Sequence, residues 1–137
     1  MRKTLVLLLV LAAAVCLVSC GKKSDETVRK EITGKTYVWE KEGFGGDFYI
    51  SLLEDGTYQY YEGFLSSFIG LGEWTVEDGV LILTDRTGYG LTFRFRVEKD
   101  RILYMAEGSG RFAHARVEDG DAFLYREDAG PAFVVDE

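Results

Sequence analysis

Apolar and polar residues alternate with a period of two along much of this 137-residue chain, and that alternation restricts the fold more than any other feature. It is clearest in Leu91–Val97, where aliphatic and aromatic residues take turns with Thr and Arg. Because successive side chains of a β-strand point to opposite faces, the pattern predicts strands with one buried and one wet face. The same period recurs in Phe48–Leu52 and Glu73–Val76. We therefore expect an all-β fold.

Turn signals divide the chain into short β-rich runs. Asp55-Gly56, Asp78-Gly79, Lys99-Asp100 and Asp119-Gly120 each stand between two such runs, as hairpin connections do. The runs predict strands near residues 36–41, 46–53, 57–62, 70–77, 80–84, 91–98, 101–106, 111–117 and 121–125. Such a meander has exposed edges unless it closes, and closure at about eight strands gives a small barrel. We expect an antiparallel up-and-down barrel over residues 35–126 and a C-terminal tail over 127–137.

The interior of this barrel is expected to be filled by side chains. A barrel of about eight strands has room for side chains or for one small ligand. The large residues available for the inside would occupy much of that space; they are Trp39, Phe48, Tyr58, Tyr60, Trp74, Phe93 and Phe95.

The first 19 residues have the order of a secretory signal peptide: a basic start, an apolar run over 5–18, and the small residue Ser19. An apolar helix of about 14 residues spans roughly 21 Å, which is too short to cross a hydrocarbon core of about 30 Å comfortably. The segment Leu17–Cys20 resembles the lipobox of bacterial lipoproteins. This resemblance implies that Cys20 becomes the lipidated N-terminus, anchored in a cell membrane or outer membrane and facing outside the cytoplasm. The alternative is an ordinary Cys20 in a signal peptide that is cut elsewhere.

Residues 20–34 would then be a polar tether, with a short helix over residues 24–33. Without Arg2 and Lys3 the chain keeps 14 of its 16 basic residues against 23 acidic ones, so the formal net charge changes from −7 to −9. Such an acidic body is repelled by nucleic acid, and we expect no nucleic-acid partner.

Several hairpin motifs resemble the small lipocalin-like domains of bacterial lipoproteins. The motifs that show this resemblance are Gly46–Phe48, the Asp-Gly-Thr-Tyr hairpin in Asp55–Tyr61, the Gly-x-Trp strand in Gly72–Trp74, and the hairpin segment Val80–Thr84. More loosely, residues 34–123 resemble extracellular domains appended to membrane metallopeptidases of the beta-lactam-sensor type. The resemblance implies a lipocalin-like barrel; its motifs are turn and core positions and transfer no active site.

The search for catalytic chemistry is mostly negative. His114 is the only histidine, so a zinc site rich in histidine is excluded, and a packed or surface histidine explains it best. Asp119–Asp121 lacks the further acidic ligands of a calcium loop. Glu73 and Asp47 would pair only if the barrel brought them together. We expect no catalytic residues, no metal, no cofactor and no enzymatic activity.

The stretch Gly63–Gly72 departs from plain alternation because its apolar residues are clustered between glycines. It forms either a hydrophobic lip that contacts a ligand or partner at one barrel mouth, or a plug that folds into the core. The residues concerned are Phe64, Leu65, Phe68, Ile69 and Leu71.

Two classes of function remain for the folded part. One is a membrane-anchored, non-catalytic module that binds or senses a small amphiphile or another cell-envelope component. The other is a protein-interaction module, such as an inhibitor or accessory subunit of an envelope protein. An interior cavity would favour the first class, and a solid interior with an exposed apolar patch the second.

Overall fold

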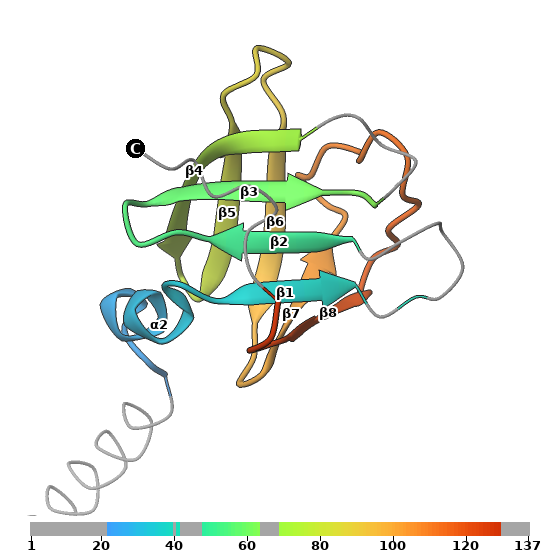
Figure 1. Cartoon of the computed structure of the whole chain (residues 1–137). Coiled ribbons are helices and arrows are strands. Elements are labelled where there is room, and N and C mark those ends of the chain that lie inside the picture. The colour runs from blue at the N-terminus through green and yellow to red at the C-terminus, as the bar shows by residue number, and fades with distance from the viewer. Residues whose placement is uncertain (1–21, 40, 42–47, 64–68, 130–137) are drawn as a thin grey trace, which may run out of the picture.

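Eight strands form a closed antiparallel barrel in which each strand pairs with the next and β8 returns to pair with β1 (Figure 1). The structure is a computed structural model that describes residues 22–39, 41, 48–63 and 69–129. The strands are β1 (Thr36–Trp39), β2 (Tyr49–Leu52), β3 (Thr57–Tyr61), β4 (Ile69–Glu77), β5 (Val80–Asp85), β6 (Thr92–Val97), β7 (Arg101–Met105) and β8 (Ala122–Tyr125). The predicted all-β, up-and-down barrel of about eight strands is confirmed.

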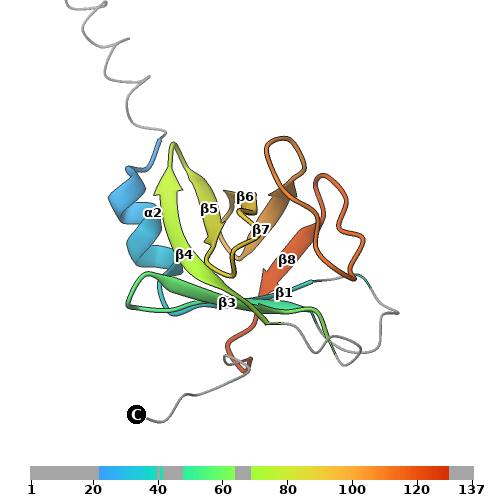
Figure 2. The ribbon, with the colours of Figure 1, turned by 90° about the horizontal axis from the view of Figure 1, so that it is seen from above.

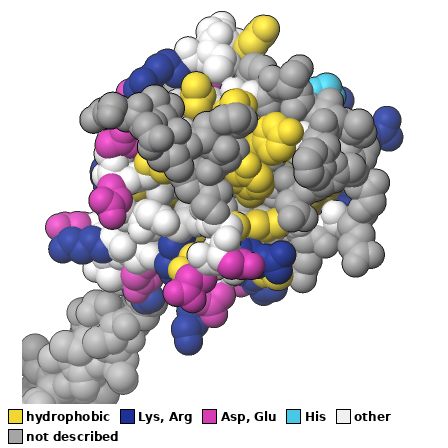
Figure 3. Space-filling view, viewed as in Figure 1, with side chains coloured by type: hydrophobic (Ala, Val, Ile, Leu, Met, Phe, Trp, Pro, Cys, Tyr) yellow, Lys and Arg dark blue, Asp and Glu magenta, His cyan; other side chains and the backbone are white. Residues whose placement is uncertain are grey.

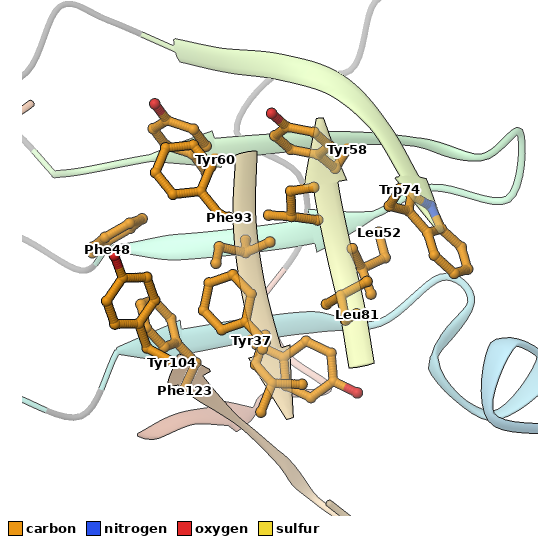
Figure 4. Packing of buried hydrophobic residues seen from close by; sticks show 14 of the residues in the cluster. Tyr37, Phe48, Leu52, Tyr58, Tyr60, Trp74, Leu81, Phe93, Tyr104 and Phe123 are labelled. Atoms are coloured by element: carbon orange, nitrogen blue, oxygen red, sulfur yellow. The ribbon is translucent and has the colours of Figure 1, made fainter. Parts of the chain in front are cut away.

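The interior is filled by the inward halves of the alternating patterns (Figure 4). In β6, Phe93 and Phe95 are fully buried, and the register places them opposite Leu83 and Leu81 of β5. Side chains from every strand join this cluster; its largest fully buried members are Trp74, Tyr37, Tyr58, Phe93, Phe95 and Phe123. All seven large residues expected inside belong to the cluster or pack against it, so the prediction of a filled barrel is confirmed for the described residues.

Two glycines of β4 allow aromatic rings to lie close to the barrel wall. A Cβ atom at Gly70 would collide with the Tyr60 ring, and one at Gly72 would collide with the backbone oxygen of Thr84. The rings of Tyr58 and Tyr60 stack on each other, with centroids 6.2 Å apart and an interplanar angle of 8°. Glycine is therefore required in β4 because neighbouring rings and backbone occupy the space of a side chain.

The helix α2 (Asp25–Ile32) packs on one end of the barrel. Ser24 caps its N-terminus by accepting a hydrogen bond from the Thr27 N–H at 3.2 Å. The Asp25 carboxylate in turn accepts the backbone N–H groups of Asp78 and Gly79 in the β4–β5 hairpin, at 3.0 and 2.9 Å. The predicted helix is thus confirmed, and it is attached to the sheet by its own first turn.

The up-and-down order gives the barrel two unlike ends. The end that carries α2 has the tight β2–β3, β4–β5 and β6–β7 hairpins, and we call it the helix end. The β1–β2, β3–β4, β5–β6 and β7–β8 connections are longer and start from the opposite end, which we call the loop end. Both views show α2 and the β7–β8 connection on opposite sides of the barrel (Figures 1 and 2).

One predicted strand is wrong. Residues 111–117 form an irregular segment inside the β7–β8 connection, and the barrel closes with β8 without them. The alternation of Phe112, His114 and Arg116 is therefore not a strand pattern. Three consecutive backbone N–H groups of this segment, at residues 113–115, are bonded by a side chain from another part of the chain, which takes the place of the partner strand expected from the sequence.

Candidate functional site

A cleft of about 1000 Å³ opens at the loop end of the barrel, along the β7–β8 connection. It is bounded by the end of β7 and by the two arms of the connection between β7 and β8. Its lining residues are Tyr104, Ala106, Ser109, Arg111, Phe112, Ala113, His114, Ala115, Arg116, Val117, Glu118 and Asp119. We call it the loop-end cleft.

The buried carboxylate of Glu62 positions the wall of the cleft. This side chain is 2% exposed, directly after β3. Its two oxygens accept three consecutive backbone N–H groups, from Ala113 at 3.1 Å, His114 at 2.8 Å and Ala115 at 2.7 Å. Hydrogen bonds to a charged acceptor are stronger than neutral ones, so one side chain fixes an irregular segment about 50 residues further along the chain.

Phe112 forms the apolar floor of the cleft and closes the barrel interior at this end. Its ring stacks on Phe93, with centroids 4.3 Å apart and planes 9° from parallel. It also meets Phe48 edge-on at 4.9 Å and Tyr60 edge-on at 5.3 Å. A ligand in the cleft would therefore lie above a packed aromatic core instead of entering the barrel.

The first arm of the connection is held by its own polar groups. The Tyr104 hydroxyl donates to the Gly110 carbonyl at 2.7 Å, and the Ser109 hydroxyl donates to the Met105 carbonyl at 2.6 Å. The Ser109 oxygen also accepts the Arg94 N–H at 2.8 Å. Burial raises the pKa of Tyr104, while its hydrogen bond to Ser109 and the nearby Arg111 partly oppose that rise.

The acidic side chains at the cleft have hydrogen-bond or ion-pair partners. Lys41 forms ion pairs with Glu118 at 2.8 Å and with Asp121 at 3.2 Å, and these two partners raise the pKa of Lys41. Asp119 accepts the Ala106 N–H at 2.9 Å.

Two arginines and the histidine that line the cleft have no such partners among the described residues. Within the described residues, the side chains of Arg111, His114 and Arg116 form no hydrogen bond or ion pair, and all three residues are exposed. The cleft therefore offers two guanidinium groups without ion-pair partners in the described part of the chain, and an imidazole, on the surface of an acidic protein.

The residues singled out in the sequence lie elsewhere. Cys20, Phe64, Leu65 and Phe68 lie outside the described residues. Ile69 and Leu71 lie on the outward face of β4, where Leu71 is 44% exposed. The lip and the plug therefore both remain predictions for the rest of the stretch. Asp47 also lies outside the described residues, whereas Glu73 is exposed and paired with Arg86.

Sequence reasoning missed Glu62, Arg111, Phe112 and Arg116 as members of one site. The available signal was Gly108–Gly110 before Arg111, since two glycines so close together weaken a strand assignment for the residues after them. His114, interpreted as a packed or surface histidine, is exposed at the cleft.

No group of three or more His, Cys, Asp or Glu side chains among the described residues is placed to hold a metal ion. In that same part of the chain, we find no helix with the length and apolar character needed to cross a membrane. Comparison of the chain with protein-family models, with curated proteins and with solved structures gave no match.

Proposed function

We propose that this protein is a lipid-anchored, non-catalytic module of the cell envelope that binds an anionic amphiphile or an anionic envelope component in its loop-end cleft. The observation that carries the proposal is that Arg111 and Arg116, which have no ion-pair partner within the described ranges, lie beside an aromatic floor at Phe112. Guanidinium groups bind carboxylate and phosphate well, and the apolar floor suits a chain or ring attached to such a head group.

The arrangement of the two ends supports an anchored role. Cys20 precedes α2 by only a few residues, and α2 packs on the helix end. A lipid on Cys20 would keep the helix end near the bilayer and direct the loop-end cleft away from it. A diacylglycerol anchor with a further acyl chain would hold the protein firmly, since each buried methylene contributes about 0.8 kcal/mol.

A second candidate function is favoured by the filled interior. With the barrel interior packed, the cleft and the outer surface are what the described part offers to a partner. An acidic segment of another envelope protein could use the same cations. In that case the module would act as an inhibitor or accessory subunit, and small amphiphiles would not compete for the cleft.

Binding of dodecyl phosphate to the unlipidated full chain (Cys20→Ser) tests the proposal, with native mass spectrometry for stoichiometry and calorimetry for affinity. Dodecyl maltoside is the probe of equal chain length without charge. We expect the phosphate to bind in a one-to-one complex and the maltoside to bind at least about tenfold more weakly, because each charge-assisted hydrogen bond is worth roughly 1.5 to 3 kcal/mol.

Arg111→Ala with Arg116→Ala should weaken dodecyl phosphate binding by about tenfold or more. The matched control is Arg101→Ala, an exposed arginine of the β6–β7 hairpin at the helix end. Equal affinity for both amphiphiles, or equal affinity of the double variant and the control, would contradict the proposal. Absence of any complex combined with capture of one envelope protein through Arg111 and Arg116 would favour the second function.

A further inference from the structure

The loop-end cleft contains charges of both signs that do not pair with one another. Its lining includes the arginines Arg111 and Arg116 and the acids Glu118 and Asp119, and all four residues are exposed. Within the described part of the chain, no ion pair joins either arginine to either acid. The fold therefore keeps the cationic and the acidic groups of one cleft apart instead of letting them neutralise each other.

Tyr104 lies between the two signs of charge. Its backbone is on the acidic side, because its N–H donates to the Asp121 carbonyl at 2.9 Å and its carbonyl accepts the Gly120 N–H at 2.8 Å. Its hydroxyl is on the cationic side, where it donates to the carbonyl of Gly110, directly before Arg111, at 2.7 Å. The backbone of the acidic stretch and the backbone before Arg111 are therefore separated by the length of one tyrosine side chain.

The electrostatic surroundings of Tyr104 agree with this position. Burial is the largest cause of the raised pKa of Tyr104, and among the charged groups Arg111 lowers this pKa while Asp119 raises it. The Tyr104 hydroxyl is thus within electrostatic range of both charges. Because Tyr104 also lines the cleft, a ligand that lies over its ring meets a guanidinium group on one side and a carboxylate on the other.

The acidic side keeps negative charge although its carboxylates have partners. Glu118 and Asp121 share one ammonium group, that of Lys41, at 2.8 and 3.2 Å. Asp119 accepts the Ala106 N–H through its Oδ1 atom, and this amide donor carries no full charge. The Asp119 Oδ2 atom has no hydrogen bond or ion pair to any described residue. Asp119 is therefore free to bind a cationic group of a ligand.

The cationic side is open to solvent. On the face seen in Figure 3, the charged side chains visible at the loop-end margin, on the right, are Lys or Arg side chains and the histidine. The acidic side chains visible on that face lie nearer the helix end. An anionic group can therefore approach the arginines of the cleft from outside.

Neither sign of charge alone matches the whole cleft. A purely anionic head group would bind the arginines but would be repelled by Asp119, and a purely cationic one would be repelled by Arg111 and Arg116. A head group with a phosphate and an ammonium a few bonds apart satisfies both sides with charge-assisted hydrogen bonds.

We propose that the ligand of the loop-end cleft is zwitterionic: its phosphate binds at Arg111 and Arg116, and its ammonium group binds at Asp119. This inference rests on the proposed function, because it requires an anionic group at the same two arginines. The same chemistry occurs in a phospholipid head group and in a free phosphorylated amine, and the Phe112 floor favours the lipid.

Removing the ammonium charge from the ligand tests the proposal without changing the cleft. The probes are dodecylphosphoethanolamine and its N-acetyl derivative, which keeps the phosphodiester and the alkyl chain but has no cationic group. Calorimetry on the full chain with Cys20→Ser measures both affinities. We expect acetylation to weaken binding by about fivefold, because it removes one ion pair at an exposed carboxylate. Equal affinity of the two probes overturns the proposal.

Phosphoethanolamine without the alkyl chain identifies the source of the head group. We expect it to bind at least about tenfold more weakly than the dodecyl compound, because it leaves the Phe112 floor uncovered. Equal affinity would assign the same zwitterionic chemistry to a free phosphorylated amine.

Asp119→Asn tests the role of the carboxylate, since asparagine keeps the Oδ1 acceptor for the Ala106 N–H and loses the charge. We expect this variant to bind the two dodecyl probes with equal affinity and to bind dodecyl phosphate no more weakly than before. The matched control is Asp100→Asn, an exposed acid in the β6–β7 turn at the helix end, which should keep the difference of about fivefold.

This inference and the proposed function fail in different ways. If Asp119→Asn still distinguishes the two dodecyl probes as the control does, the assignment of the ammonium to Asp119 is wrong, while binding at the arginines stands. If dodecyl phosphate binds equally well after Arg111→Ala with Arg116→Ala, the proposed function itself is wrong.

Discussion

Replacing Glu62 by Gln should lower the free energy of unfolding by about 2 to 3 kcal/mol, although it removes only one charge. In the wild-type chain, one carboxylate oxygen accepts from His114 and Ala115, and the other accepts from Ala113. A glutamine keeps one of these acceptors and turns an NH₂ group toward an N–H donor. One bond is lost, a donor faces a donor, and the two remaining bonds become neutral.

The magnitude depends on the burial of this side chain. Glu62 is 2% exposed, so water does not readily replace a lost partner. A buried donor without an acceptor costs about 1 to 3 kcal/mol, and a hydrogen bond to a charged acceptor contributes about 1.5 to 3 kcal/mol against 0.5 to 1.5 for a neutral one. Glu62→Ala removes all three acceptor contacts and should cost about 4 kcal/mol, which is close to the stability of many small domains.

Urea unfolding followed by tryptophan fluorescence measures the change, and thermal unfolding should show a decrease in Tm of about 8 to 12 °C for Glu62→Gln. Glu73→Gln is the matched control, because Glu73 is an exposed carboxylate bonded only to Arg86 in the described part, and an exposed pair contributes at most about 1 kcal/mol. If Glu62→Gln and Glu73→Gln unfold at the same urea concentration, the view that Glu62 fixes residues 113–115 is wrong.

Two further results are expected. Burial raises the pKa of Tyr37, Tyr58 and Tyr60 well above that of a free tyrosine. The stability that these protonated, buried tyrosines contribute is therefore fully present below pH 10. Above pH 10 the unfolded chain loses these protons and the folded chain keeps them, so the free energy of unfolding falls by up to about 1.4 kcal/mol per pH unit for each tyrosine. In urea titrations between pH 8 and 11, Tyr37→Phe should reduce this decrease of the unfolding free energy with pH. An unchanged decrease would contradict the raised pKa of Tyr37. Separately, Cys20→Ser should move the protein out of the membrane fraction and remove the acyl mass, whereas Cys16→Ser should not; equal membrane retention of both variants would refute the lipid anchor.

The barrel could be predicted because its determinants are local. The alternation in Leu91–Val97 became β6 with Phe93 and Phe95 inside, and the Asp-Gly pairs at 55–56 and 78–79 became hairpin turns. Ser24 and the acids after it likewise identified α2. In each case the residues that determine the structure are neighbours in sequence, so the pattern alone carries the information.

The candidate site could not be predicted because its determinants are distant. Arg111–Val117 alternates like a strand, and only the bonds to Glu62, about 50 residues earlier, show that its backbone has another partner. Likewise, nothing local distinguishes Arg111 and Arg116 from other surface arginines, because the difference is that their acidic neighbours bond elsewhere. The burial of Thr36 and Ser51 on the outward faces of β1 and β2 was missed for the same reason, since outward serine and threonine residues ordinarily face water.

The seam between β1 and β8 joins the first strand to the last, with Tyr37 opposite Tyr125 and Trp39 opposite Phe123. Such a pairing has to wait for nearly the whole polypeptide, since a nascent chain that lacks Phe123 has neither the final wall nor one of its largest core rings. Closing so long a loop is entropically costly and slow. A chain of this design therefore acquires its final shape in one late step, once almost the whole polypeptide is available to fold.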